Sequence, residues 1–213
     1  MSVNLPSERF SAYSHLLGAI LGLIGTIILI AKNFDHSNYI FIVLIYGFAL
    51  INMFFSSFLY HSRKKHEDEK SIFRKLDHCA IFIMIAGCYT PISYFAVPDP
   101  WRWIIIGSQW GLVAIGIIVK FIIINTKRWI TTGVYLAQGW MAVLPIKFLW
   151  ENLTLLMFLM LFLGGMAYSI GAVFYALKKP NPLPGKFGFH EIFHVFILIG
   201  AALHYILIYN VVP

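Results

Sequence analysis

The amino-acid sequence predicts an all-α membrane protein, a bundle of seven transmembrane helices that forms one domain over residues 1–213. Three observations lead to this fold class. Of the 213 residues, 60% are hydrophobic and only 12% are charged, whereas charged residues make up about 25% of a typical soluble domain. The apolar residues fall in runs close to the ~20 residues that cross the hydrocarbon core of a bilayer. Short polar connections separate most of these runs and leave no room for a soluble domain.

Five of the seven runs have further sequence support. The first is longer than the apolar core of a signal peptide and precedes no A-x-A site, so we expect it to be retained. Tryptophans near the ends of the fourth and fifth runs are typical of membrane interfaces. The sixth run carries small residues that we expect to pack against a neighbouring helix. Prolines in the following connection end the helix of the sixth run and lead into the seventh run. The predicted spans are approximately 12–31, 39–60, 77–97, 101–124, 130–149, 153–176 and 189–211.

The basic residues predict the orientation. A net charge of +7 on a folded surface would suggest nucleic acid, but here the Lys and Arg residues concentrate in the connections, so no nucleic-acid partner is expected. With the N-terminus in the cytoplasm, only Lys32, Arg102 and Lys147 lie outside. This bias predicts a cytoplasmic N-terminus and, after seven crossings, an external C-terminus. The thirteen residues expected inside are Arg9, Arg63, Lys64, Lys65, Lys70, Arg74, Lys75, Lys120, Lys127, Arg128, Lys178, Lys179 and Lys186.

Three histidines on distant spans are predicted to lie at the same depth of the membrane. His61 ends an inward-going span, while His190 and His194 begin the outward-going last span. Residues i and i+4 share a helix face, so His190 and His194 can hold one ion together. A third imidazole would complete a Zn²⁺ site with one open position. The alternative is that His190 and His194 are interfacial histidines that hydrogen bond to loop carbonyls. At a rise of ~1.5 Å per residue, His204 lies ~15 Å beyond His194 and is excluded as a ligand.

Two further polar residues are expected in the same leaflet. Ser57 lies one turn from His61 on the same face, and Asp77 begins the third span. Polar groups inside membrane helices usually face the bundle interior, which makes both candidates for a functional site. Asp77 also suits a helix N-cap, and the two roles are compatible. Ser57 can instead bond the carbonyl one turn back. His78, adjacent to Asp77, is the residue most easily mistaken for a ligand.

The segment His190-Glu-Ile-Phe-His194 also matches the H-E-x-x-H pattern of zinc metalloproteases, in which the glutamate is the general base. The longest such signature has a third histidine six residues on, where this chain has Gly200. The third ligand must therefore come from upstream. We expect Glu191 to contact loop lysines or to support the ligands from outside the coordination sphere.

Several segments together resemble the haemolysin III group of the progestin and adipoQ receptor (PAQR) superfamily, which includes the adiponectin receptors. The resemblance covers nearly the whole chain and implies a seven-helix bundle with zinc held by residues 61, 190 and 194. It also implies that Asp77 orients a metal-bound water and that Ser57 lines the site. Glu8 and His15 fall within the family's polar first-helix motif, whose usual Asn is absent near Ala12, and neither receives a role. The matching segments are Ser57-Phe-Leu-Tyr-His61, Lys75-Leu-Asp-His-Cys-Ala-Ile-Phe82, Gly87-Cys-Tyr-Thr-Pro91, Gly164-Gly-Met-Ala-Tyr-Ser-Ile-Gly171 and Gly188-Phe-His-Glu-Ile-Phe-His194.

The resemblance implies a zinc-dependent hydrolase of lipid amide or ester bonds, similar to a ceramidase and serving membrane lipid homeostasis. Asp77 and Ser57 would be its catalytic residues, a membrane lipid its substrate or ligand, and the plasma (inner) membrane of a prokaryote its location. Two alternatives stay open. The first is a non-enzymatic receptor or sensor in which zinc clamps helices. The second is a membrane-lytic, haemolysin-like protein, although this composition allows no soluble stage before insertion.

Overall fold

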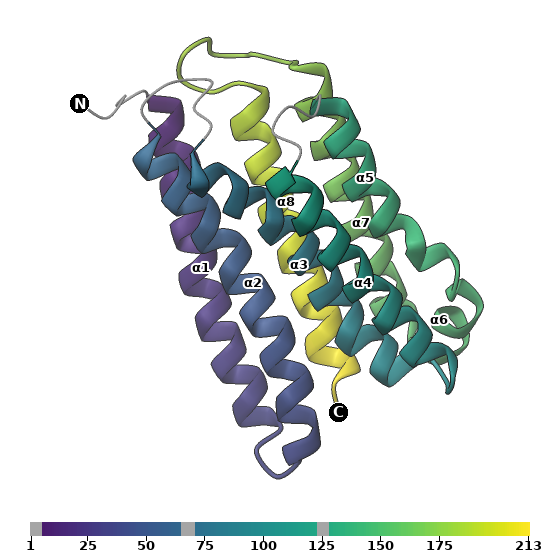
Figure 1. Cartoon of the computed structure of the whole chain (residues 1–213). Coiled ribbons are helices and arrows are strands. Elements are labelled where there is room, and N and C mark those ends of the chain that lie inside the picture. The colour runs from purple at the N-terminus through teal and green to yellow at the C-terminus, as the bar shows by residue number, and fades with distance from the viewer. Residues whose placement is uncertain (1–5, 65–70, 123–127) are drawn as a thin grey trace.

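The computed structural model describes residues 6–64, 71–122 and 128–213, with the side chains of residues 6, 7 and 128 excepted. All regular elements of the described chain are helical, and they form a bundle of roughly parallel rods (Figure 1). Six helices are long and apolar enough to cross a membrane, which makes the chain a multi-pass membrane protein. They are α1 (Pro6–Lys32), α2 (Ser37–Arg63), α3 (Ile72–Ala96), α4 (Trp101–Ile122), α7 (Leu155–Leu177) and α8 (Phe189–Val211).

The fifth expected span is broken into pieces rather than continuous. It consists of α5 (Arg128–Trp140), a short 3₁₀ turn η1 (Met141–Val143) and α6 (Ile146–Asn152). Pro145 separates the last two, as expected for a residue that cannot continue a helix. Figure 1 shows α5 beginning at the end of the bundle where α4 finishes and α6 lying at the opposite end. The single helix predicted over 130–149 is therefore wrong, and the count of seven crossings stays a prediction.

The third helix starts earlier than expected. The predicted span begins at Asp77, but α3 begins at Ile72, with the Ser71 hydroxyl accepting a hydrogen bond from the Arg74 amide at 3.4 Å. Ser71 is therefore the N-cap, a position that favours serine because its side chain satisfies a free backbone amide. The interpretation of Asp77 as an N-cap is wrong, since Asp77 lies inside the helix.

Helix α8 packs against three other helices, α1, α3 and α7. Cβ atoms added at Gly164 and Gly171 would collide with His204 and Phe196, both on α8. These two glycines therefore provide the close packing that the sequence predicts for the sixth run. Gly165 does not contribute, because a side chain there would meet only open space.

The two ends of the bundle differ in charge. Among the described residues, nine of the thirteen cations expected inside lie near the end where α1 begins, on the adjoining helix termini and connections (Figure 1). Lys65, Lys70 and Lys127 lie outside the described residues, and the side chain of Arg128 is not described. At the other end, Lys32 donates hydrogen bonds to the carbonyls of Tyr209 and Val212, both at 2.7 Å. The described N-terminal and C-terminal segments therefore lie at opposite ends.

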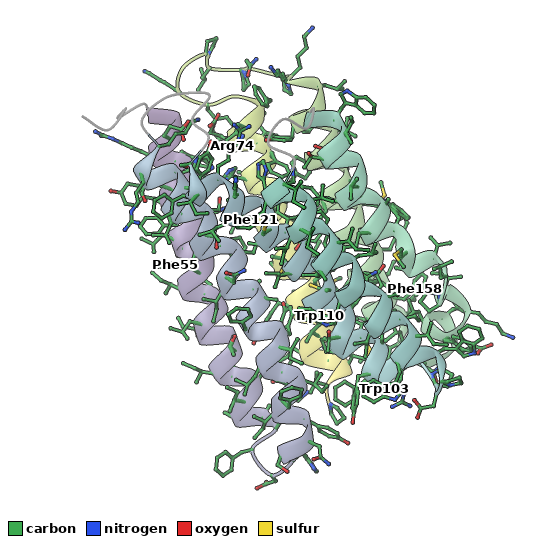
Figure 2. All side chains as sticks on the ribbon, viewed as in Figure 1. Phe55, Arg74, Trp103, Trp110, Phe121 and Phe158 are labelled. Carbon is green, nitrogen blue, oxygen red and sulfur yellow. The ribbon has the colours of Figure 1, made fainter. Side chains whose placement is uncertain are left out.

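Aromatic and aliphatic residues cover the outside of the bundle. Trp103 is more than half exposed and lies near the end opposite Arg74 (Figure 2). Leu17, Leu21 and Ile24 of α1 are about half exposed or more. In water such a surface would favour aggregation. In a bilayer it is the surface that the lipid chains solvate.

We expect close packing at Gly87 to control stability. A Cβ at Gly87 of α3 would overlap the Cβ of Ala49 on α2, and neither atom can move without the backbone. Replacing Gly87 with alanine should therefore cost about 1–3 kcal/mol, as overpacking does, and lower the Tm of the purified protein in detergent. Gly111→Ala is the matched control, because no described atom of another helix would lie within 4 Å of the new methyl. Equal Tm values for the two variants would contradict this packing argument.

Candidate metal centre

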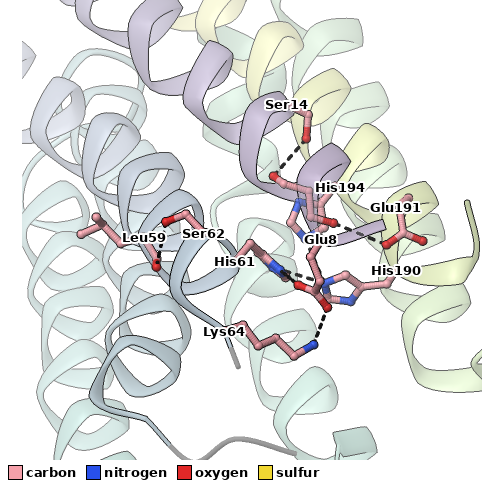
Figure 3. A network of polar contacts seen from close by, with 10 residues as sticks. Glu8, Ser14, Leu59, His61, Ser62, Lys64, His190, Glu191 and His194 are labelled. Carbon is pink, nitrogen blue, oxygen red and sulfur yellow. Dashed lines mark hydrogen bonds and ion pairs between the residues drawn. The ribbon is translucent and has the colours of Figure 1, made fainter. Parts of the chain in front are cut away.

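Three imidazoles converge at the end of the bundle where α1 begins. His61 occupies the last turn of α2, while His190 and His194 occupy the first turns of α8 (Figure 3). The Nε2 atom of His190 lies 3.3 Å from Nε2 of His61 and 3.1 Å from Nε2 of His194. His61 and His194 are 4% and 2% exposed. The predicted meeting of these three histidines is therefore confirmed.

The geometry of the three nitrogens fits a tetrahedral ion. With Zn–N bonds of about 2.0–2.1 Å, two imidazole nitrogens on a tetrahedral zinc lie about 3.3 Å apart. Two of the three separations match this value closely, and all three ligand atoms lie within 4.8 Å of one another. Within the described ranges, the group that could hold a metal contains only these three residues. Three imidazole donors, without a fourth protein ligand among the described residues, suit a metal site that keeps one position open.

A carboxylate from α1 supports His61 from behind. The Nδ1 atom of His61 lies 2.7 Å from Oε2 of Glu8, whose Oε1 pairs with Nζ of Lys64 at 2.5 Å (Figure 3). An ionised carboxylate only accepts hydrogen bonds, so Nδ1 carries the proton and Nε2 keeps its lone pair for a metal. Carboxylates in this position orient metal-binding histidines and raise their basicity. The sequence offered one signal for this role, since Glu8 is an acidic residue near the start of an apolar helix.

Glu191 stabilises the start of α8. Its Oε2 accepts a hydrogen bond from the Gly188 amide at 2.7 Å, and the Ser11 hydroxyl lies 3.5 Å from its Oε1. Gly188 has no side chain to return the interaction, so only half of a capping box forms. The expected contact with loop lysines does not occur among the described residues. Glu191 instead ties the first turn of α8, which carries His190, to α1.

Asp77 and Ser57 lie beside the three histidines and line a cavity. The Asp77 carboxylate interacts with the Ser57 side chain and electrostatically with His61 and Arg74. Asp77 does not belong to the group of potential metal ligands. Its position next to that group suits a residue that acts on a water or substrate rather than one that binds the ion.

The other histidines near the site occupy different positions. His15 on α1 packs its ring against that of His194, with centroids 3.9 Å apart. His204 lies deeper along α8, where its Nε2 is 3.3 Å from the carbonyl of Leu161. As the sequence predicts, it does not join the group of potential metal ligands. His78 lines the cavity but also stays outside the cluster.

The cavity has a volume of about 510 Å³. It runs from the histidine end toward Leu149 and Phe158 near the far end of the bundle, along α3, α5, α7 and α8. Its lining is mostly apolar, with polar groups concentrated at the histidine end. Ligand-binding pockets combine these features, because the apolar walls bind the ligand and a few polar groups orient it.

The fold and the site define the class: a multi-pass helical membrane protein with a largely buried three-histidine cluster at one end of an apolar cavity. Residues 3–205 match the family model described as haemolysin-III related, and the chain belongs to this family. It is 35% identical over 205 residues to hemolysin-3 of Bacillus cereus, covering 95% of this chain and 90% of that protein. It is 32% identical to a hemolysin-3 homolog of Bacillus subtilis, covering 93% and 91%. An adiponectin receptor protein of Drosophila melanogaster is 26% identical over 221 residues, which are 93% of this chain and 49% of the receptor.

Proposed function

We propose that this protein is a zinc-dependent hydrolase that cleaves an amide or ester bond of a membrane lipid. The observation that carries the proposal is the cluster of three Nε2 atoms at the polar end of an apolar cavity. His61, His190 and His194 would hold the ion. When bound, zinc would supply a Lewis acid that lowers the pKa of a bound water to about 7 and polarises a carbonyl.

The proposed roles of the protein's own residues follow from their positions. Asp77 accepts the proton of the attacking water at its carboxylate and returns it to the leaving group, as a general base and then acid. When substrate binds, the Ser57 hydroxyl turns from Asp77 and donates a hydrogen bond to the substrate oxygen on which negative charge develops. Glu8 keeps the proton on Nδ1 of His61, so that Nε2 faces the reacting end. Acyl chains occupy the apolar part of the cavity, which extends away from these groups.

The experiment that tests this function combines metal analysis with a lipid panel. Protein purified in detergent and shown to contain one zinc per chain is incubated with ceramides and phospholipids, and released fatty acid is measured by mass spectrometry. The proposal expects release by the zinc-loaded protein and none by the metal-stripped protein. Full zinc occupancy without release from any lipid would support the alternative, a zinc-stabilised receptor or sensor. One observation favours that alternative, namely the name of the Drosophila relative, an adiponectin receptor protein.

We further propose that α5, η1 and α6 make the fifth of seven crossings, with the N-terminus in the cytoplasm and a prokaryotic plasma membrane as the location. The asymmetry of charge between the two ends supports this orientation, and the Bacillus relatives support the location. Reporter fusions after Pro213 are expected to give a signal from outside the cell. Fusions within the connection from Arg63 to Lys75 should report from the cytoplasm. A cytoplasmic C-terminus would place the histidine cluster in the outer leaflet and contradict the proposal.

Replacing Glu8 with glutamine is expected to weaken zinc binding by about 10-fold to 100-fold, the usual effect of losing a carboxylate behind a histidine ligand. The amide keeps the size of the side chain but removes its charge, so Nδ1 of His61 loses its strongest acceptor. Competition with a zinc-selective chelator measures the affinity. Glu151→Gln is the control, because Glu151 lies at the far end and pairs only weakly with Lys147, at 4.0 Å. Equal affinities in the two variants would show that Glu8 does not position His61.

A further inference from the structure

Two polar side chains line the same cavity far from the histidine cluster. They are Tyr168 of α7 and His204 of α8, whose rings meet edge to face with centroids 5.4 Å apart. We call Tyr168 and His204 the deep polar pair. At a rise of ~1.5 Å per residue, His204 lies ~15 Å beyond His194 along α8. Neither residue takes part in the proposed chemistry.

Glycines on the two helices hold the deep polar pair in place. The ring of Tyr168 lies over Gly200 of α8, where an added Cβ would come within 2.8 Å of its Cζ atom. The ring of His204 lies over Gly164 of α7 in the same way. Each ring therefore fills the space that a side chain on the facing helix would occupy. The close packing of α7 against α8 thus fixes both rings at the cavity wall.

The deep polar pair has polar atoms without partners among the described residues. Both Oη of Tyr168 and Nδ1 of His204 are buried, and neither forms a hydrogen bond within the described chain. The hydroxyl of Tyr89, which lines the same cavity, does have a partner, since it donates to the carbonyl of Gly139 at 2.7 Å. Buried polar groups in proteins are normally hydrogen-bonded. The two unpaired atoms are therefore positions at which a ligand in the cavity can bind.

The two atoms have complementary hydrogen-bonding roles. The Nε2 atom of His204 lies 3.3 Å from the carbonyl oxygen of Leu161, which can only accept, so Nε2 carries the ring proton. In the neutral imidazole Nδ1 is then an acceptor, whereas the Tyr168 hydroxyl can donate. A hydroxyl group on a ligand satisfies both, because it can accept from the tyrosine and donate to the histidine. A carbonyl would satisfy only Tyr168, and a methylene group would satisfy neither.

The surrounding walls indicate what carries this hydroxyl. Leu161, Phe162 and Ile197 line the cavity near the pair, and such apolar walls suit an alkyl chain. The proposed function places the acyl carbonyl at the histidine end, ~15 Å from His204 along the helix axis. With C–C bonds of about 1.5 Å, an extended chain advances about 1.3 Å per carbon and covers this distance in about 12 carbons.

We infer that the deep polar pair binds a hydroxyl group on the acyl chain of a lipid, about 12 carbons from the carbonyl. The position of the carbonyl rests on the proposed function. In that case the inference names the substrate class, which is lipids with a hydroxylated acyl chain. The hydroxyl site itself requires only that an alkyl chain occupies the cavity.

The test measures the binding of free fatty acids, which needs no hydrolysis, to the full-length protein in detergent by native mass spectrometry. The probes are stearic acid and two hydroxystearic acids, with the hydroxyl on the seventh or the twelfth carbon. Wild type should bind the acid hydroxylated on the twelfth carbon about 10-fold more tightly than stearic acid, because stearic acid leaves a buried donor and acceptor unpaired. The acid hydroxylated on the seventh carbon should show no such gain, since its hydroxyl does not reach the pair.

Replacing Tyr168 with phenylalanine removes the hydroxyl and keeps the ring on Gly200. This variant should lose the 10-fold preference and bind stearic acid as wild type does, which also shows that the cavity is intact. Tyr46→Phe is the matched control. Tyr46 of α2 has a buried hydroxyl without a described partner as well, but it does not line the cavity. The Tyr46 variant should therefore keep the preference.

Each outcome decides the inference. Equal binding of stearic acid and the acid hydroxylated on the twelfth carbon by wild type would overturn it, as would a preference that survives in Tyr168→Phe. The same preference for both hydroxystearic acids would also overturn it, because the effect would then come from chain polarity alone. Hydrolysis of lipids without any hydroxyl preference would support the proposed function and overturn only this inference. A preference in a protein that hydrolyses no lipid would support the inference and contradict the hydrolase.

Discussion

Replacing His61 with alanine is expected to remove zinc from the purified protein. The substitution takes away one of the three imidazole donors. The two that remain, His190 and His194, both lie on α8, so the ion would lose its ligand from α2. The loss of affinity should exceed 100-fold, because losing even an outer partner of a ligand costs about 10-fold to 100-fold. Inductively coupled plasma mass spectrometry of wild-type and variant protein, purified in parallel, gives the zinc content directly.

His204→Ala is the control for this experiment. His204 is also a buried histidine and lies on the same helix as His190 and His194, but it contacts Leu161 and Gly164 rather than the cluster. Its removal should leave about one zinc per chain, even if it lowers the Tm. Equal zinc contents in the His61 and His204 variants would contradict the assignment of the metal centre.

Replacing Asp77 with asparagine is expected to lower turnover by ~10² to 10⁴, the usual contribution of a general base, while zinc stays bound. Asparagine keeps the shape of the side chain and can still hydrogen bond to Ser57, but it cannot accept the proton of water. The carboxylate is not among the potential metal ligands, so its loss should spare the coordination sphere. Fatty-acid release from the best lipid of the panel and zinc content are measured on the same preparation.

The same variant separates the enzymatic interpretation from the structural one. If Asp77→Asn loses its zinc and unfolds at a lower temperature, and the wild type hydrolyses nothing, zinc acts as a clamp between α2 and α8. A structural site of that kind contributes to folding rather than to chemistry. Ser57→Ala adds a second comparison. It should reduce turnover and leave the metal in place, because Ser57 interacts with Asp77 and is not one of the three histidines of the cluster.

The family relationship and the site geometry contribute different information. Membership of the haemolysin-III related family covers residues 3–205 and establishes the type of membrane protein. The names of the Bacillus relatives describe those proteins as hemolysins, and the name of the Drosophila relative describes a receptor. The positions of the histidines, Asp77 and the cavity are what favour hydrolysis of a lipid over either description.

Much of the candidate site could be predicted because it depends on local spacing and on depth. His190 and His194 are one helical turn apart, and the alternation of inward and outward spans places His61 at the same level. The partner of His61 could not be predicted in the same way. Glu8 lies 53 residues away on another helix, and only the packing of α1 against α2 brings its carboxylate to Nδ1. The cap at Ser71 was missed because the apolar run begins later than the helix.

The sequence by itself determined the membrane class, six of the helices and the charge asymmetry between the ends, because these follow from hydrophobicity and composition along one segment at a time. Tertiary structure decided the rest. The break in the fifth span and the positions of Glu8 and Glu191 depend on which helices meet and at what rotation. The cavity also arises from that packing, since it is the space left between helices whose side chains come from distant parts of the chain.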